Sequence, residues 1–301
     1  MAELRPLVFL IFLGSSWGFY FSMLKIAVLS GISYVGIAAL TTLGVGAGMI
    51  AIAVARGRKP GWSGRHHGFY LVCALSGYLV PIVTELVVIA HMPAGVLTLI
   101  VGMAPLVTFL IAWLVKTDRV TLVRGGGVLL GAFAIFAILL PDANTSEDVA
   151  WRWLLLATIV PVSYSIHHNF AARFWPGRDD SYQVACGEAV YASVLMIGLS
   201  LFTWQWQDVQ TWNAGHTAIV IMALIALVDI YVYFELIRIK GPIYTSHANY
   251  VMIVSGVFWG MMIFAERPSP WMWLSAVLLL ASLYLIGDRR TRGQAVEQEN
   301  S

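Results

Sequence analysis

The sequence predicts an all-α integral membrane protein with ten transmembrane helices, arranged as two inverted five-helix repeats with both termini cytoplasmic. Three observations support this fold class. The composition is strongly apolar, with 59% hydrophobic and only 11% charged residues, whereas soluble domains carry about 25% charged residues. Apolar runs of transmembrane length recur along the whole chain, and basic residues gather in alternate links between them.

Each apolar run is long enough to cross a membrane, because a helix needs about 20 residues to span a hydrocarbon core of about 30 Å. The runs occupy residues 6–29, 32–56, 68–90, 93–116, 120–140, 151–172, 181–204, 215–238, 243–264 and 269–287. The links between them are short and leave no room for a water-soluble domain. The first run is too long for the apolar region of a signal peptide, so we expect it to be retained as a helix.

The basic residues predict the orientation. If the N-terminus is cytoplasmic, 15 of the 18 Lys and Arg residues fall on the cytoplasmic side. These are Arg5, Arg56, Arg58, Lys59, Arg65, Lys116, Arg119, Arg124, Arg173, Arg178, Arg238, Lys240, Arg289, Arg290 and Arg292. The outer links hold only Arg152 and Arg267, and Lys25 lies inside the first run. Such an excess of basic residues marks the cytoplasmic loops of membrane proteins.

The two halves of the chain resemble each other weakly. A shift of 148 residues places 105–139 on 253–287. The same shift places Asp118 on Glu266, and each of these acids lies between two apolar runs. Because five helices per copy is an odd number, the copies must have opposite topology, which is the architecture of many secondary transporters. We expect residues 1–145 to form the first repeat, 146–290 the second, and 291–301 a disordered cytoplasmic tail.

Several short motifs add to this pattern. They are Trp17-Gly18 with Phe21 and Lys25, then Ala104-Pro105, the acid-bearing turns at Asp118 and Glu266, and the glycines Gly125, Gly126, Gly127 and Gly131. Their order and spacing resemble the EamA-type family of the drug/metabolite transporter superfamily, over about residues 5–290. The chain departs from that pattern at Asp118, where Glu is usual, and at Ile253, where a proline would be expected. More narrowly, it is similar to the bacterial aromatic amino-acid exporters of the family.

Lys25 is an ammonium group inside an apolar helix. It shares a helical face with Gly18 and Ser22. One interpretation is that Lys25 snorkels to the outer interface. The other is that it faces a central cavity, where it meets a substrate carboxylate or pairs with Glu85, which lies at a similar depth on a face shared with Tyr78. A charge inside a membrane needs hydration or a partner, and a Lys25–Glu85 pair could also be purely structural.

Three further acids lie in apolar runs. Glu235 is close to the cytoplasmic end and beside Arg238, so we expect it to be interfacial. Asp229 is deeper and shares a face with Tyr233, which makes it a candidate proton site, although it could equally accept hydrogen bonds from a neighbouring helix. Glu188 lies in the seventh run and could take the same role.

Aromatic and histidine side chains supply the remaining candidates. Together with the charged residues above they form a predicted substrate-binding set: Trp17, Lys25, Tyr78, Glu85, Tyr164, His167, Tyr233, His247 and Tyr250. We expect the first, third, fourth, sixth, eighth and ninth runs to line the cavity, with Pro81, Pro105 and Pro161 as hinges. A wall of rings and hydroxyls suits a flat aromatic substrate, but packing and hydrogen bonding between helices explain the same residues.

Other classes of function lack their sequence signatures. No P-loop, HExxH, CxxC or nucleophile elbow is present, and Cys73 and Cys186 lie in apolar runs. We therefore predict no catalytic residue, no cofactor and no metal site, and no nucleic-acid partner. An intramembrane enzyme stays a remote alternative, because it would need a nucleophile and base, or a set of metal ligands, converging at one depth.

The sequence thus predicts a multi-pass secondary transporter of the bacterial inner membrane. We expect it to export amino acids, with aromatic ones (Phe, Tyr, Trp) first, by alternating access through a central cavity. Its partners would be the small-molecule substrate and the lipid bilayer, and the choice between monomer and homodimer is open. The alternative is an exporter or facilitator of another metabolite or drug on the same fold.

Overall fold

The computed structural model describes residues 4–114, 122–139, 151–177, 179–205 and 211–287, and within them the chain is entirely helical, with no strand. The predicted turn at Asp118 and the predicted tail after residue 290 lie outside these residues. Among the described helices, 6 are long and apolar enough to cross a membrane, and three shorter ones are equally apolar.

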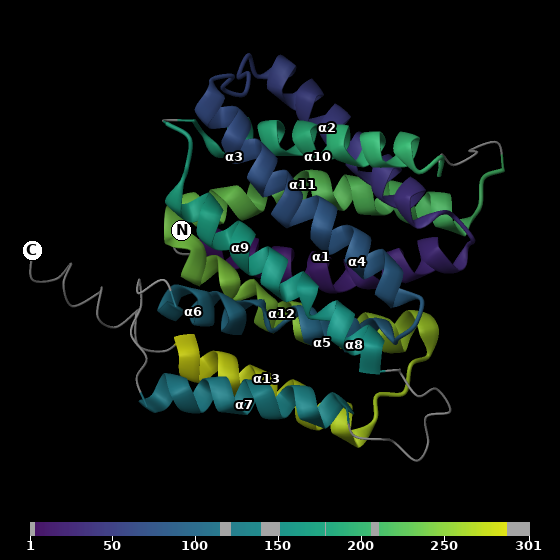
Figure 1. Ribbon diagram of the computed structural model, residues 1–301, viewed down its shortest axis with the longest axis vertical. Coiled ribbons are helices and arrows are strands. Elements are labelled where there is room, and N and C mark those ends of the chain that lie inside the picture. The colour runs from purple at the N-terminus through teal and green to yellow at the C-terminus, as the bar shows by residue number, and fades with distance from the viewer. Residues whose placement is uncertain (1–3, 115–121, 140–150, 178, 206–210, 288–301) are drawn as a thin grey trace, which may run out of the picture.

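The first half of the chain contains seven α-helices and one π-helical segment, labelled as in Figure 1. They are α1 (Leu4–Leu29), α2 (Tyr34–Ala55), α3 (Gly64–Ala74), η1 (Leu75–Leu79), α4 (Val80–Ile89), α5 (Ala94–Val101), α6 (Ala104–Leu114) and α7 (Leu122–Leu139). Segments α3, η1 and α4 continue one another, and α5 and α6 are separated only by Gly102 and Met103.

The second half follows the same plan. It contains α8 (Trp151–Ala157), α9 (Ile159–Arg173), α10 (Ser181–Phe202), α11 (Ala214–Ser246), α12 (Ala248–Phe264) and α13 (Pro270–Gly287). Helix α11 is kinked at Gly241, whose φ of 81° is outside the helical region and is reached most easily by glycine. When contiguous segments are joined and α11 is divided at its Gly241 kink, the described residues form 10 helical rods, whose bounds match the ten predicted runs to within a few residues.

Three internal breaks in the helices each lie just before one of the prolines that the sequence suggested as hinges. Pro81 is the second residue of α4, Pro105 the second of α6 and Pro161 the third of α9. Proline has no N–H to donate and its ring clashes with the carbonyl four residues earlier, so the preceding turn departs from regular α-helix. The three prolines therefore interrupt long helices in the interior of the bundle without ending them.

Helices of the two halves pack on one another in matched pairs. Helix α1 packs on α11 and α12, while α9 makes the corresponding contacts with α4 and α6. Helix α2 packs on α10, and α7 on α13, the last pair lying side by side at the bottom edge of Figure 1. Two related five-helix halves that interlock would make this set of contacts.

Small residues set the closest of these contacts. A Cβ added at Gly18 would overlap Ser255 Oγ and lie 2.5 Å from the backbone nitrogen of Gly256. A Cβ at Gly14 would lie 3.1 Å from the backbone nitrogen of Met252. The small-residue face of α1 therefore serves close packing against α12, as small residues do between membrane helices.

Candidate functional site

A cavity of about 170 Å³ lies at the centre of the bundle, between the two halves of the chain. Residues of α1, α2, η1, α4, α5 and α6 line it from the first half, and residues of α9, α10, α11 and α12 from the second. The contributions of α2, with Thr41 and Thr42, and of α10, with Glu188, were not among the predicted lining helices. A binding site between the repeats is where such a fold is expected to hold a ligand.

The cavity brings together part of the predicted substrate-binding set. Trp17, Tyr78, Tyr164, His167 and Tyr233 all contribute to its lining, as does the candidate proton site Asp229. The remaining members, Lys25, Glu85, His247 and Tyr250, lie outside the lining. The predicted residues that do line the cavity thus come from α1, η1, α9 and α11.

Tyr233 is the centre of an aromatic wall. Its ring stacks on His167 with centroids 5.5 Å apart, and lies 5.4 Å from the ring of His168 and 6.3 Å from that of Trp17. The Tyr233 hydroxyl lies 3.5 Å from His167 Nδ1. These offset and tilted rings present both π faces and polar edges to the cavity, a surface that suits a ligand with an aromatic body.

Two carboxylates face the same space. Asp229 accepts a hydrogen bond of 2.7 Å from the Ser16 hydroxyl through Oδ1. Glu188 is more deeply buried, with 1% of its surface exposed. Its Oε1 lies 3.0 Å from His167 Nε2. The described residues that line the cavity include no Lys and no Arg, so its fixed charges are carboxylates.

Sequence reasoning placed Glu188 in a helix but left it out of the predicted binding set. The sequence did offer one indication of a functional role, because an ionisable residue within a membrane helix is usually functional. The missing information was the rotation of the seventh run. Apolar and small residues surround this whole helix, so its pattern does not say which face turns inward.

The predicted pairing of Lys25 with Glu85 is wrong. Lys25 Nζ lies 2.9 Å from Glu266 Oε1 and 4.9 Å from the ring centroid of Phe264. The same Glu266 accepts the backbone N–H groups of Ala94 at 3.0 Å and Gly95 at 3.4 Å. Lys25 therefore does not face the cavity. It completes a three-way contact between α1, the start of α5 and the link after α12.

Glu85 has a different partner. Its side chain is fully buried, and Oε1 accepts a hydrogen bond of 2.9 Å from the Tyr164 hydroxyl. Because Tyr164 lies on the cavity wall, Glu85 fixes the position of a lining ring from behind. Depth along the membrane, on which the pairing with Lys25 was based, does not specify the direction in which a side chain points.

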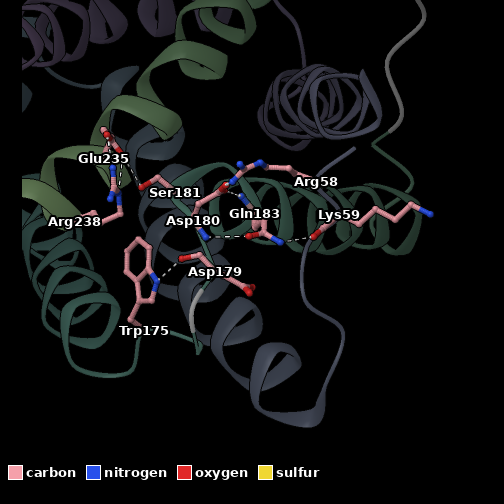
Figure 2. Close-up of polar contacts among 9 residues, drawn as sticks. All are labelled: Arg58, Lys59, Trp175, Asp179, Asp180, Ser181, Gln183, Glu235 and Arg238. Carbon is pink, nitrogen blue, oxygen red and sulfur yellow. Dashed lines mark hydrogen bonds and ion pairs between the residues drawn. The ribbon is translucent and has the colours of Figure 1, made fainter. Parts of the chain in front are cut away.

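Glu235 pairs with Arg238, which lies one helical turn away on the same helix. Arg238 donates to both carboxylate oxygens, at 2.7 Å and 2.9 Å. Ser181 adds a hydrogen bond of 3.0 Å, as Figure 2 shows, and Arg5 of α1 lies 3.3 Å away. Glu235 thus joins α1, α10 and α11 at one end of the bundle.

A second polar cluster lies beside it in Figure 2. Asp180 begins α10 as its N-cap, where it accepts the Gln183 N–H at 3.0 Å and contacts Arg58. Gln183 in turn donates to the carbonyl of Lys59 at 2.8 Å. This cluster ties the α2–α3 link to the start of α10.

His247 and Tyr250 lie where α11 meets α12. Their rings are 5.5 Å apart, and His247 Nδ1 lies 3.2 Å from the carbonyl oxygen of Tyr244. Both of these contacts lie at the junction of α11 and α12. No group of three or more His, Cys, Asp or Glu side chains in the described part of the chain is arranged to hold a metal ion.

The comparison with protein families identifies the chain. The sequence profile of the EamA-like transporter family matches it twice, over residues 4–140 and 151–287. The chain belongs to the EamA-like transporter family. It is accordingly a multi-pass membrane transporter, and two copies of the family unit account for the matched packing of its halves.

Solved structures support the fold of this EamA-like transporter. One, described only as "Crystal structure of protein", matches with a TM-score of 0.64 over 92% of this chain and 97% of its own, at 18% sequence identity. At that identity the match concerns the fold alone. A search of curated proteins found no match.

Proposed function

We propose that this EamA-like transporter exports amino acids, aromatic ones first, across the bacterial inner membrane. The observation that carries the proposal is the central cavity, which lies between the two family units and combines an aromatic wall with buried carboxylates. A transported aromatic amino acid would present a flat apolar ring and an ammonium group, and both find matching chemistry in this cavity.

The residues have distinct roles in the proposed complex. The substrate ring packs against Trp17, Tyr78 and Tyr233, and the Tyr164 hydroxyl, held by Glu85, marks one edge of the site. The ammonium group lies near the carboxylates, and the imidazoles of His167 and His168 are the nearest donors for the substrate carboxylate. Asp229 is a candidate proton site in this scheme, with Ser16 holding one of its oxygens.

Transport is proposed to proceed by alternating access. The two five-helix repeats, residues 1–145 and 146–290, would rock against each other in inverted orientation, with both termini cytoplasmic. The helix breaks before Pro81, Pro105 and Pro161 would serve as hinges, because the turns there already depart from regular helical hydrogen bonding.

A specific observation favours one alternative substrate class over another. Because the described cavity lining has no Lys or Arg, it offers no fixed positive charge to phosphates or other polyanions. Organic amines and cationic drugs therefore rank above nucleotide sugars as alternative substrates on the same fold. Facilitated diffusion of a neutral metabolite would use the aromatic wall alone.

Counterflow in liposomes containing only this protein tests the proposal. The liposomes are loaded with unlabelled phenylalanine, tryptophan, threonine or a nucleotide sugar, and uptake of labelled phenylalanine is followed. Stimulation by phenylalanine and tryptophan but not by threonine or the nucleotide sugar is expected. If folded protein gives no stimulation with any amino acid, the substrate assignment is wrong, and drug-like amines become the leading class.

A further inference from the structure

Glu188 is the most deeply buried acid on the cavity wall. Only 1% of its surface is exposed, and it lies at the middle of α10 among small and apolar neighbours. Apart from the 3.0 Å contact with His167, neither carboxylate oxygen meets a hydrogen-bond donor within the described residues. An ionised carboxylate without further donors is costly in such a place, so it requires a cationic partner there.

The backbone in front of Glu188 is irregular. The π-helical segment η1 passes directly before the carboxylate, and a Cβ at Gly77 would lie 3.1 Å from Glu188 Oε1 and 3.1 Å from His167 Nδ1. Single π-helical turns occur frequently at functional sites. The carbonyl of Ser76 is taken up by the Ser163 hydroxyl at 2.9 Å. The π-helical turn thus brings the backbone at Gly77 close to Glu188, while the Ser76 carbonyl accepts its hydrogen bond from Ser163.

The titratable groups around Glu188 come from four helical segments. His167 and His168 face it from α9, Cys73 from α3, Tyr78 from η1, and Tyr233 from α11, with Asp229 one turn away on α11. Helix α2, which also packs on α10, carries no charged residue. Among these groups, His167 is the one in direct contact with the carboxylate, with Nε2 3.0 Å from Oε1.

From this arrangement we infer that Glu188 is the exchange site of the transporter, a carboxylate that binds the substrate's ammonium group and a proton in alternation. His167 is its positioning residue. The inference rests on the proposed function, because it takes an ammonium-bearing aromatic molecule as the substrate. It moves the coupling role from Asp229, one of whose oxygens is already held by Ser16, to Glu188, which lines the cavity and whose oxygens accept no hydrogen bond from the described residues.

The exchange balances in protons, and because the amino acid is a zwitterion, each cycle moves one net positive charge inward. Substrate binding displaces one proton from Glu188 to water on the cytoplasmic side, and the ammonium group takes its place beside the carboxylate. After the cavity opens to the other side, the substrate leaves and one proton from that side binds Glu188. Each cycle therefore exports one substrate molecule and imports one proton, with no bond made or broken in the substrate.

The experiment uses three probes with the same ring. Phenylalanine carries both charged groups, phenethylamine only the ammonium, and 3-phenylpropionate only the carboxylate. Purified protein in weakly buffered detergent solution is mixed with each probe, and binding and proton release are measured by calorimetry in buffers of different ionisation enthalpy. Phenylalanine and phenethylamine should release about one proton per site bound, and 3-phenylpropionate should release none.

Variants assign the proton to its residue. Glu188→Gln keeps the size of the side chain and should abolish proton release and remove the pH dependence of binding. Asp229→Asn, in the same cavity, should weaken binding of the ammonium-bearing probes, but each molecule bound should still release about one proton. Glu235→Gln removes an acid outside the cavity lining and should change neither binding nor release. His167→Gln should shift the pH dependence of binding while leaving the release in place, because it repositions the carboxylate without replacing it.

The outcomes separate this inference from the proposed function. Phenylalanine counterflow without proton release, or release that survives Glu188→Gln and is lost in Asp229→Asn, would overturn the exchange role of Glu188 alone. Proton release by phenethylamine without amino-acid counterflow would support Glu188 and overturn the amino-acid substrate. If wild-type protein binds only 3-phenylpropionate, or none of the probes, the exchange site is refuted whatever the variants do.

Discussion

The two ends of α1 are held in different ways. They are separated by about 30 Å, since a helix rises 1.5 Å per residue. At the Lys25 end, a single carboxylate, Glu266, collects the ammonium group and two backbone N–H groups, with side-chain exposures of 18% for Lys25 and 13% for Glu266. At the Arg5 end, Glu235 forms ion pairs with Arg5 and Arg238, and the side chains of both arginines are about half exposed.

The two kinds of contact predict different ways for each end of α1 to separate from its neighbours. A largely buried pair with backbone donors attached is costly to break, because its members lose their partners together. Exposed ion pairs exchange readily with water and contribute little each. We therefore expect the Lys25 end to separate in one cooperative step and the Arg5 end to loosen gradually.

The largest effect is expected at Glu266. Glu266→Gln removes the charge opposite Lys25 and weakens acceptance of the Ala94 and Gly95 N–H groups. The free energy of unfolding should fall by about 3 kcal/mol, the scale for breaking a buried pair from one side. The measurement is SDS-induced unfolding of the purified protein followed by tryptophan fluorescence.

A double variant supplies the control for this prediction. Lys25→Met with Glu266→Gln removes both charges, and it should be more stable than Glu266→Gln alone, because no unpaired ammonium group is left. If the single and double variants are equally stable, the charge pair does not hold this end of α1.

The helices at these two ends were predictable from the sequence, and the contacts between them only in part. The ten runs coincide with helical rods because hydrophobic length fixes a membrane helix before any packing is known. The pairing of Glu235 with Arg238 was predictable for a similar reason, since residues three apart on a helix are neighbours. Both inferences depend on local spacing alone.

Contacts between distant segments lay beyond such reasoning. Lys25 and Glu266 are 241 residues apart, and only the packing of α1 on α12 brings them together. The weak repeat did single out Glu266, as the counterpart of Asp118, but gave no partner for it. Glu188 was left out of the predicted substrate-binding set because its helix has no polar face that would fix the rotation of the helix.

The next effect concerns the middle of α1, between its two ties. Gly18→Val places new atoms against Ser255 and the backbone of Gly256, and overpacking of this kind costs roughly 1–3 kcal/mol. It should lower the midpoint of SDS-induced unfolding. If close packing holds α1 to α12 more than its end contacts do, this loss will approach that of Glu266→Gln.

A matched glycine provides the control. Gly198 lies inside α10 with open space around its Cβ position, so Gly198→Val should change stability by well under 1 kcal/mol. Equal losses at Gly18 and Gly198 would mean that backbone propensity, and not the α1–α12 contact, governs the result.

A smaller effect is expected at the Arg5 end. Glu235→Gln leaves Arg5 and Arg238 in contact with water, since 57% and 49% of their side chains are exposed. The free energy of unfolding should fall by about 1 kcal/mol, and 0.5 M NaCl should reduce the difference from wild type because salt screens exposed charges. A loss that is large and independent of salt would mean that this end is as tightly held as the Lys25 end.

The smallest effect is expected at Arg58, whose contact with the α10 N-cap Asp180 lies in the exposed cluster of Figure 2. Arg58→Gln leaves the Asp180–Gln183 cap intact, so the free energy of unfolding should change by no more than about 0.5 kcal/mol. Asp180→Ala removes the cap as well and should cost about 1 kcal/mol. If Arg58→Gln instead destabilises the protein as much as Glu266→Gln does, one exposed ion pair would control this link, and the contrast between a cooperative end and a gradual end would not hold.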